Sequence, residues 1–123
     1  MKDINGAKPR LTAATLRRIV GDHAPSVHGL RRVGLVGSYA REDYSPASDV
    51  DLVFDMDETF SDETFTETGV LLRSIFMDQF RKELDIIRYA SIFACLHKPE
   101  KLTESQLKGY KKMLEDLVWI WGE

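Results

Sequence analysis

Two short segments of this chain carry groups that could act together on a phosphate. Gly37 and Ser38 end one apolar run, and Asp49 and Asp51 open the next. A glycine lets the backbone approach a ligand closely, and the amides and hydroxyl of a Gly-Ser turn can bind a phosphate. Two carboxylates separated by one residue leave a strand on the same face, about 6.6 Å apart at their Cα atoms, and can hold a divalent metal. A metal beside a phosphate is the arrangement that nucleotidyl transfer needs.

Two further residues extend this group. Asp85 lies early in a later apolar run, and a third carboxylate could ligate a metal or act as general base toward an attacking hydroxyl. Arg41 shares a face with Ser38 in a helical turn, and a guanidinium there suits a triphosphate. The candidate nucleotide-binding residues are therefore Gly37, Ser38 and Arg41, and the candidate catalytic and metal-binding residues are Asp49, Asp51 and Asp85.

The hydrophobic pattern predicts the elements that position these groups. The connection from 38 to 48 is too short for a crossover helix, so the strands on either side of it are expected to be antiparallel. A helix separates the second strand from the third, so those two are expected to be parallel. The fold class is then α/β (α+β), a small mixed β-sheet with flanking helices. The expected helices span residues 12–21 and 66–82, and the expected strands span 32–37, 49–55 and 83–89.

A last helix is predicted from Thr103 onward. Thr103 and Gln106 match a capping box, and an apolar stripe follows at helical spacing. Core packing is the favoured interpretation of that stripe, and a partner surface is the alternative. The stripe consists of Leu107, Tyr110, Leu114, Leu117, Val118 and Trp121.

Composition limits the classes of protein that are possible. The 123 residues are 43% hydrophobic, which fits one packed domain at 11–123 after a flexible leader at 1–10. The net charge of -3 does not favour a nucleic-acid partner. A single cysteine excludes an internal disulfide, and three dispersed histidines do not favour zinc. No apolar run is long enough for a membrane span and no signal peptide is evident, so a soluble cytoplasmic protein is expected.

Gly37-Ser38, ten intervening residues and Asp49-Val50-Asp51 resemble the signature of the DNA polymerase β-like nucleotidyltransferase superfamily. The short length resembles its minimal nucleotidyltransferase (MNT) branch. The resemblance implies that the Gly-Ser pair binds the phosphates of ATP, that the two aspartates hold Mg²⁺, and that Asp85 completes the acidic triad. Members of the family commonly read Gly-Ser-x-Ala-Arg-Gly, whereas here Glu42 follows Arg41 and brings an anion near the expected triphosphate.

In the resembled family, MNT proteins often act as antitoxins to HEPN-domain toxins, and some transfer AMP from ATP to a toxin tyrosine. The resemblance therefore implies a Mg²⁺-dependent nucleotidyltransferase that modifies a hydroxyl of a HEPN toxin. The residues after 89 have room for one long helix and not for an acceptor domain, which agrees with a protein acceptor. Two alternatives stay open. One is a non-catalytic antitoxin or regulatory binding module, and the other is a small-molecule nucleotidyltransferase completed by a homo- or hetero-oligomer.

Overall fold

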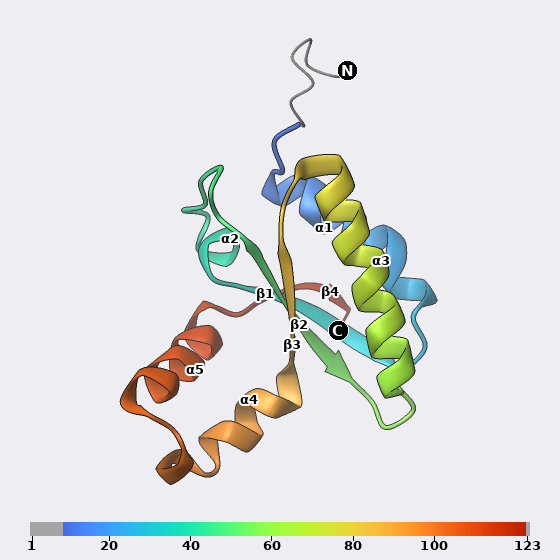
Figure 1. Ribbon diagram of the computed structural model, residues 1–123. Coiled ribbons are helices and arrows are strands. Elements are labelled where there is room, and N and C mark those ends of the chain that lie inside the picture. The colour runs from blue at the N-terminus through green and yellow to red at the C-terminus, as the bar shows by residue number, and fades with distance from the viewer. Residues whose placement is uncertain (1–8, 123) are drawn as a thin grey trace.

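A four-stranded mixed sheet lies at the centre of the computed structural model, which describes residues 9–122 (Figure 1). Its strand order is β3-β2-β1-β4. β1 runs antiparallel to β2 and to β4, and β2 runs parallel to β3. The expected fold class and the expected directions of the first three strands are confirmed. The strands are β1 (Leu30–Val36), β2 (Val50–Met56), β3 (Leu84–Arg88) and β4 (Val118–Gly122). The expected leader at 1–10 lies mostly outside the described residues.

Helices cover both faces of the sheet (Figure 1). The larger apolar cluster lies between the sheet and α1 and α3, and includes Leu16, Leu52, Phe54 and Phe76. A smaller cluster on the opposite face joins Val53 to residues of α4 and α5. No helix of the described part could cross a membrane. The helices are α1 (Ala13–His23), α2 (Ser38–Arg41), α3 (Asp62–Phe80), α4 (Tyr89–Leu96) and α5 (Glu104–Asp116), with short 3₁₀ turns η1 (Ala24–Ser26) and η2 (Pro99–Lys101).

Side-chain caps start α1 and α5 where the sequence predicts them, whereas α3 begins at Asp62, before the expected residue 66. The Thr12 hydroxyl accepts a hydrogen bond from the Thr15 amide at 3.2 Å, which satisfies a free donor of the first turn of α1. At α5 the capping box is complete. The Gln106 amide donates to the Thr103 hydroxyl at 3.1 Å, and the Thr103 amide donates to the Gln106 side chain at 3.0 Å.

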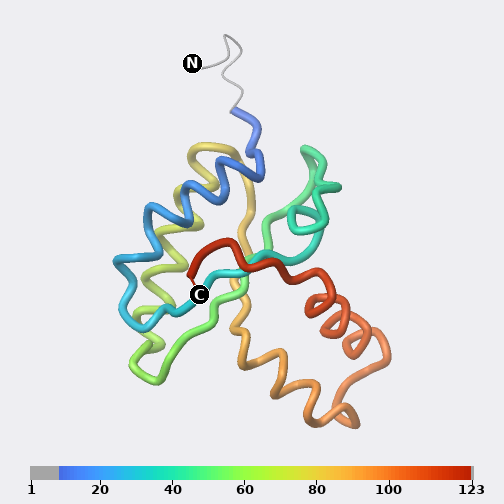
Figure 2. Tube along the Cα trace, turned by 180° about the vertical axis from the view of Figure 1, so that it is seen from behind, coloured from blue at the N-terminus to red at the C-terminus, as the bar shows by residue number. Residues whose placement is uncertain are grey.

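The segment after the third strand differs from the expectation. One long helix through Trp121 is wrong, because α4 comes first, α5 ends at Asp116, and Val118–Gly122 forms β4. This last strand returns across the molecule to lie beside β1, far from it in sequence (Figure 2). Its β-branched and aromatic residues fit a helix stripe and a strand equally well by local pattern. Val118–Gly122 forms a strand because the free edge of β1 provides hydrogen-bonding partners for it.

The two tryptophans of β4 face opposite sides of the sheet. Trp121 pairs with Val33 and Trp119 pairs with Gly34, so Ile120 is an extra residue that shifts the register. Trp121 packs against the larger apolar cluster, while the Trp119 ring lies 5.0 Å from that of Tyr89 at the start of α4.

Gly34 makes this close approach possible. A Cβ at Gly34 would collide with the Leu117 side chain and lie 3.1 Å from the Trp119 ring. A glycine inside a strand often marks such an approach by another segment. Gly34 therefore lets the end of α5 and the start of β4 pack on the sheet.

Candidate active site

The three candidate carboxylates share one region of the sheet. Asp51 on β2 pairs in register with Asp85 on β3. Adjacent strands of a sheet lie about 4.8 Å apart, so these two residues are direct neighbours. Val50 and Leu52 enter the core beneath α1 and α3, so by alternation Asp51 faces the other way. Asp49 stands immediately before β2, two residues from Asp51. Asp49, Asp51 and Asp85 thus lie at the beginnings of two adjacent strands.

Burial and the two neighbouring carboxylates disfavour the charged form of Asp51. Asp51 is half-buried, and burial raises its pKa above the ordinary aspartate value, with further upward contributions from the charges of Asp85 and Asp49. Among the described residues, none of the three forms an ion pair with a lysine or arginine. The repulsion is therefore not compensated by a side-chain cation.

Gly37 lies directly against this group. Its φ of 74° and ψ of -153° belong to a backbone region that is essentially reserved for glycine. A Cβ at this position would lie 3.0 Å from the Asp51 carboxylate oxygen Oδ2. The Gly37 carbonyl also accepts hydrogen bonds from the amides of Ala40 and Arg41, each at 3.1 Å, which fold the turn into α2. The Gly-Ser turn therefore lies next to the Asp51 carboxylate, and their common role stays a prediction.

Tyr39 anchors the turn that carries Ser38. The Tyr39 side chain is fully buried, and its ring stacks on Tyr44 with centroids 4.2 Å apart and an interplanar angle of 8°. Its hydroxyl donates to the Leu11 carbonyl at 3.5 Å. Burial raises the pKa of the Tyr39 hydroxyl above 10.0, so it remains a neutral donor. This packing holds the half-buried Ser38 at the start of α2.

Arg41, a candidate phosphate ligand, is engaged with two acidic residues. Its Nε donates to Asp43 at 3.1 Å and its NH1 donates to Asp116, the last residue of α5, at 2.6 Å. Lys112 also lies 3.3 Å from the buried Asp116 carboxylate. Hydrogen bonds to Asp43 and Asp116 raise the pKa of Arg41. Arg41 therefore links the end of α2 to α5, and its role toward a nucleotide stays a prediction.

Glu42 occupies a backbone position that favours glycine. With φ at 63° and ψ at 24°, it ends α2 in the left-handed conformation. Non-glycine residues adopt this conformation at a cost, and glycine removes that cost. The presence of Glu42 where the family usually has glycine therefore affects the backbone conformation as well as the local charge.

Lys82 supports the site, and sequence reasoning missed it. The side chain is buried, and its Nζ donates to the carbonyls of Pro46 at 2.5 Å and Ser48 at 2.6 Å. The Val50 amide nearby donates to the Glu83 carbonyl at 3.1 Å. These bonds fix the chain on both sides of Asp49. A lysine between two charged residues looks like an ordinary solvated side chain, so the sequence held no signal for this role.

The donor set of the carboxylate group fits a hard cation. Carboxylate oxygens are the ligands that Mg²⁺ prefers, and a divalent charge would offset the burial and the like charges that raise the pKa of Asp51. Within residues 9–122, no three histidine, cysteine or acidic side chains lie in an arrangement that could already hold a metal ion. Asp49, Asp51 and Asp85 are the residues that could hold the ion, and their convergence on it stays a prediction.

The family of the chain follows from a direct comparison. Residues 14–120 match the model of the nucleotidyltransferase domain, so the chain belongs to that family and is a nucleotidyltransferase. This match covers the Gly-Ser turn and all three carboxylates. It confirms the family that the motif predicted. Comparison with curated proteins gives no match.

Solved structures with the same fold come from toxin–antitoxin complexes. A chain of a toxin–antitoxin crystal structure with AMP-PNP is 17% identical, with a TM-score of 0.55, over 92% of this chain and 75% of that chain. A complex of tri-AMPylated Shewanella oneidensis HEPN toxin with MNT antitoxin gives 16% identity and a TM-score of 0.52, over 88% and 71%. A mutant MntA-HpeT toxin–antitoxin structure gives 15% and 0.55, over 92% and 75%. The described fold is therefore that of the MNT structures.

Proposed function

We propose that this chain transfers AMP from ATP to a hydroxyl of a protein partner, a tyrosine of a HEPN-domain toxin, and thereby acts as its antitoxin. The observation that carries the proposal is the register pair of Asp51 and Asp85, with Gly37 packed against the Asp51 carboxylate. The carboxylate trio and the Gly-Ser turn supply the two halves of a nucleotidyl-transfer site. The toxin–antitoxin neighbours support the class of partner, and the AMP-PNP complex supports the nucleotide.

Each group has a distinct task in this reaction. The Gly37-Ser38 turn binds the β- and γ-phosphates, because its amides and hydroxyl can donate to anionic oxygens. Asp49 and Asp51, with Asp85, would hold Mg²⁺, which when bound neutralises charge on the phosphates and clamps the oxygens of an in-line displacement. Asp85 is exposed on the edge strand β3 and accepts the proton of the incoming hydroxyl.

The bonds exchanged follow from these positions. The acceptor oxygen forms a bond to the α-phosphorus of ATP, and the bond from that phosphorus to the bridging oxygen breaks. Pyrophosphate leaves on the side of the Gly-Ser turn, and the hydroxyl proton moves to a carboxylate oxygen of Asp85. The products are an AMP ester of the partner and pyrophosphate.

The experiment is to co-purify the chain with the product of its neighbouring gene and to weigh both proteins with and without ATP and Mg²⁺. The partner should gain about 329 Da, the mass of one AMP residue, for each transfer. The matched variant is Asp49→Asn, which keeps the size of the side chain and removes its charge. No mass gain with the parent, together with full inhibition of the unmodified partner by Asp49→Asn, would establish a non-catalytic antitoxin instead.

A further inference from the structure

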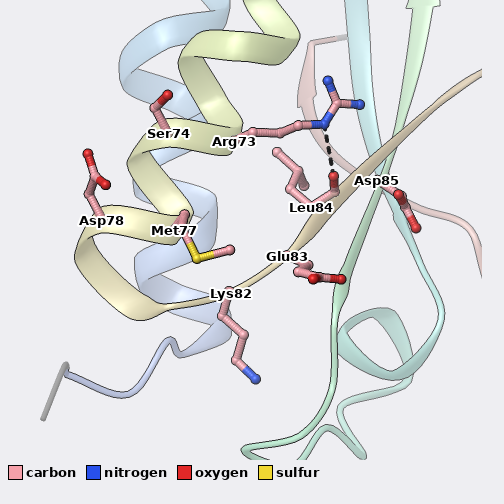
Figure 3. A pocket seen from close by; sticks show the side chains of 8 residues that line it. All are labelled: Arg73, Ser74, Met77, Asp78, Lys82, Glu83, Leu84 and Asp85. Atoms are coloured by element: carbon pink, nitrogen blue, oxygen red, sulfur yellow. Dashed lines mark hydrogen bonds between the residues drawn. The ribbon is translucent and has the colours of Figure 1, made fainter.

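The candidate carboxylates lie on the side of the sheet that carries α4 and α5. Leu84 packs in the larger apolar cluster with residues of α3, so by alternation the side chain of Asp85 leaves β3 on the opposite face. Figure 3 shows Leu84 lying toward Arg73 of α3, whose Nε donates to the Leu84 carbonyl at 3.1 Å, and Asp85 pointing away. The groove between α3 and β3 therefore does not open on the carboxylates. Val53, which shares a face with Asp51, packs against residues of α4 and α5.

The single helical turn α2, which carries Ser38, depends on contacts outside itself. An isolated helical turn is unstable, because fixing its residues costs more than its few hydrogen bonds return. One outside contact is the buried ring of Tyr39, which packs in the larger apolar cluster. The other is Arg41, the last residue of α2, which donates to the Asp116 carboxylate at 2.6 Å. The helical turn is therefore held both by the core and by α5.

The Asp116 carboxylate needs the cations that surround it. Its side chain is only 8% exposed, and as the last residue of α5 it lies at the end of the helix where the dipole disfavours an anion. Arg41 lies 2.6 Å from its Oδ2, and Lys112 lies 3.3 Å from its Oδ1. Removal of one partner from a buried ion pair leaves charge uncompensated and is strongly unfavourable. A nucleotide is therefore expected to bind Arg41 without removing it from Asp116.

The end of α5 is itself fixed to the strand that leads into the Gly-Ser turn. Leu117 follows Asp116 and lies over Gly34 on β1, where a Cβ would collide with the Leu117 side chain. α5 then leads into β4, which lies beside β1 (Figure 2). Gly37 directly follows β1. The contacts therefore form a closed ring, from β1 through the Gly-Ser turn and Arg41 to Asp116 and back to β1, and such support can hold a side chain in one orientation.

The guanidinium of Arg41 has donors left for a ligand. Its Nε donates to Asp43 at 3.1 Å, and one terminal nitrogen donates to Asp116 at 2.6 Å. A guanidinium carries five N–H donors, and the hydrogen bonds within residues 9–122 leave its other terminal nitrogen available. Arg41 lies three residues after Ser38, so the two side chains share one face of the turn. An anionic ligand at that face can accept hydrogen bonds from both.

We propose that Asp116 is a positioning residue for nucleotide binding. Its carboxylate holds the Arg41 guanidinium in the orientation that presents the available nitrogen to a phosphate oxygen, and it holds α2 in the conformation that carries Ser38. Asp43 bonds to the same guanidinium, but its side chain is 60% exposed, and solvent screens such a pair. This inference rests on the proposed function and adds to it a residue of α5 that is remote in sequence from the Gly-Ser motif.

The test compares Asp116→Asn with Asp43→Asn by calorimetric titration with ATP and Mg²⁺. Both changes keep the size of the side chain and remove a charge that pairs with the same guanidinium. Asp116→Asn should raise the Kd about tenfold, and Asp43→Asn should stay within about twofold of the parent. Lys112→Met removes the other cation of Asp116 and leaves Arg41 in place, so its Kd should equal that of the parent. Thermal unfolding checks that each variant is folded.

A double-mutant cycle separates positioning from general support of the fold. Arg41→Ala should weaken ATP binding by itself. Because Asp116 acts through Arg41, the double variant Arg41→Ala/Asp116→Asn should bind ATP no more weakly than Arg41→Ala. A general loss of stability would instead add to the effect of Arg41→Ala. Asp116→Ala removes the acceptor oxygen as well as the charge, and it should raise the Kd at least as far as Asp116→Asn.

Four results would overturn the role of Asp116. These are a parent-like or lower Kd in both Asp116 variants, an equal rise of the Kd in Asp43→Asn or Lys112→Met, additive losses in the cycle, and a parent that binds no ATP. Failure of the proposed function is a separate result, in which the parent binds ATP and transfers no AMP to its partner. The comparison of Kd values then still decides on Asp116.

Discussion

Asp51 and Asp85 lie opposite each other on the adjacent parallel strands β2 and β3. Asp51 is half-buried, and this burial raises its pKa, whereas Asp85 is exposed at the sheet edge. Two carboxylates in such different surroundings are suited to different tasks, one as a metal ligand and the other as a base that meets the acceptor. The same pairing predicts how the protein responds to pH and to cations.

The first prediction concerns the charge on Asp51. Because burial, Asp85 and Asp49 raise its pKa in the folded state, the contribution of Asp51 to stability is fully present below the unfolded pKa of about 3.9 and is lost as the pH rises through the folded pKa. Asp51→Asn should therefore melt at a higher temperature than the parent at pH 7 in the presence of a chelator. The difference should shrink as the pH falls toward 4.

The control for this prediction is Asp55→Asn, on the same strand. Asp55 lies 2.8 Å from the Arg32 guanidinium, so its loss should lower the melting temperature at pH 7. Addition of Mg²⁺ and ATP should stabilise the parent and not Asp51→Asn. A lower melting temperature for Asp51→Asn in chelator would show that the carboxylates do not repel one another in the folded protein.

The second prediction concerns the phosphate-binding turn. Ser38→Ala should weaken the binding of ATP with Mg²⁺ by about 1–3 kcal/mol, the range for a hydrogen bond to a charged group. Thermal unfolding should change little, because the buried Tyr39 anchors the turn. Calorimetric titration with ATP measures the effect, and Ser26→Ala on η1 is the control away from the site. Unchanged affinity in Ser38→Ala would remove the hydroxyl from the proposed contacts.

The third prediction separates backbone strain from charge at Glu42. Glu42→Gly should raise the free energy of unfolding by about 1 kcal/mol, because glycine adopts the left-handed conformation without penalty. Arg81 has a φ of 54°, so Arg81→Gly should give a similar gain at the end of α3. Denaturant titration measures both variants.

Glu42→Gln is the charge control at the same position, since it removes the anion and keeps the strain. Tighter ATP binding in both Glu42→Gly and Glu42→Gln would identify the charge as a penalty. Weaker binding in both would indicate that the carboxylate organises Arg41 or the nucleotide. A change in Glu42→Gly alone would assign the effect to the backbone of α2.

The fourth prediction concerns Lys82 as a positioning residue for Asp49. Lys82→Met leaves the carbonyls of Pro46 and Ser48 without their donor and should lower the free energy of unfolding by about 1–3 kcal/mol. It should also weaken ATP binding that depends on Mg²⁺. Lys111→Met on the exposed side of α5 is the matched control and should change neither quantity. A Lys82→Met protein with the ATP affinity of the parent would show that Asp49 needs no such support.

Local pattern and chain length were sufficient to predict where the candidate residues lie in the fold. The short connection between Ser38 and Ser48 forces an antiparallel return, and the helix before Asp85 forces a parallel crossover. Those two constraints place the Gly-Ser turn, Asp49, Asp51 and Asp85 at one end of one sheet. The helix caps at Thr12 and Thr103 were predictable for a similar reason, since a cap depends on residues three positions apart.

Only the tertiary structure decided the features that depend on distant segments. Val118–Gly122 is a strand because β1 offers a free edge, and Gly34 leaves room for the approach. Arg41 meets Asp116 because α5 folds back toward α2, and Lys82 meets Pro46 and Ser48 because β2 and β3 begin side by side. Each contact joins residues far apart in sequence, and the local sequence pattern does not indicate which distant residues will meet. The positions of the candidate residues are therefore determined by local sequence, while the contacts that hold them in place arise from the fold.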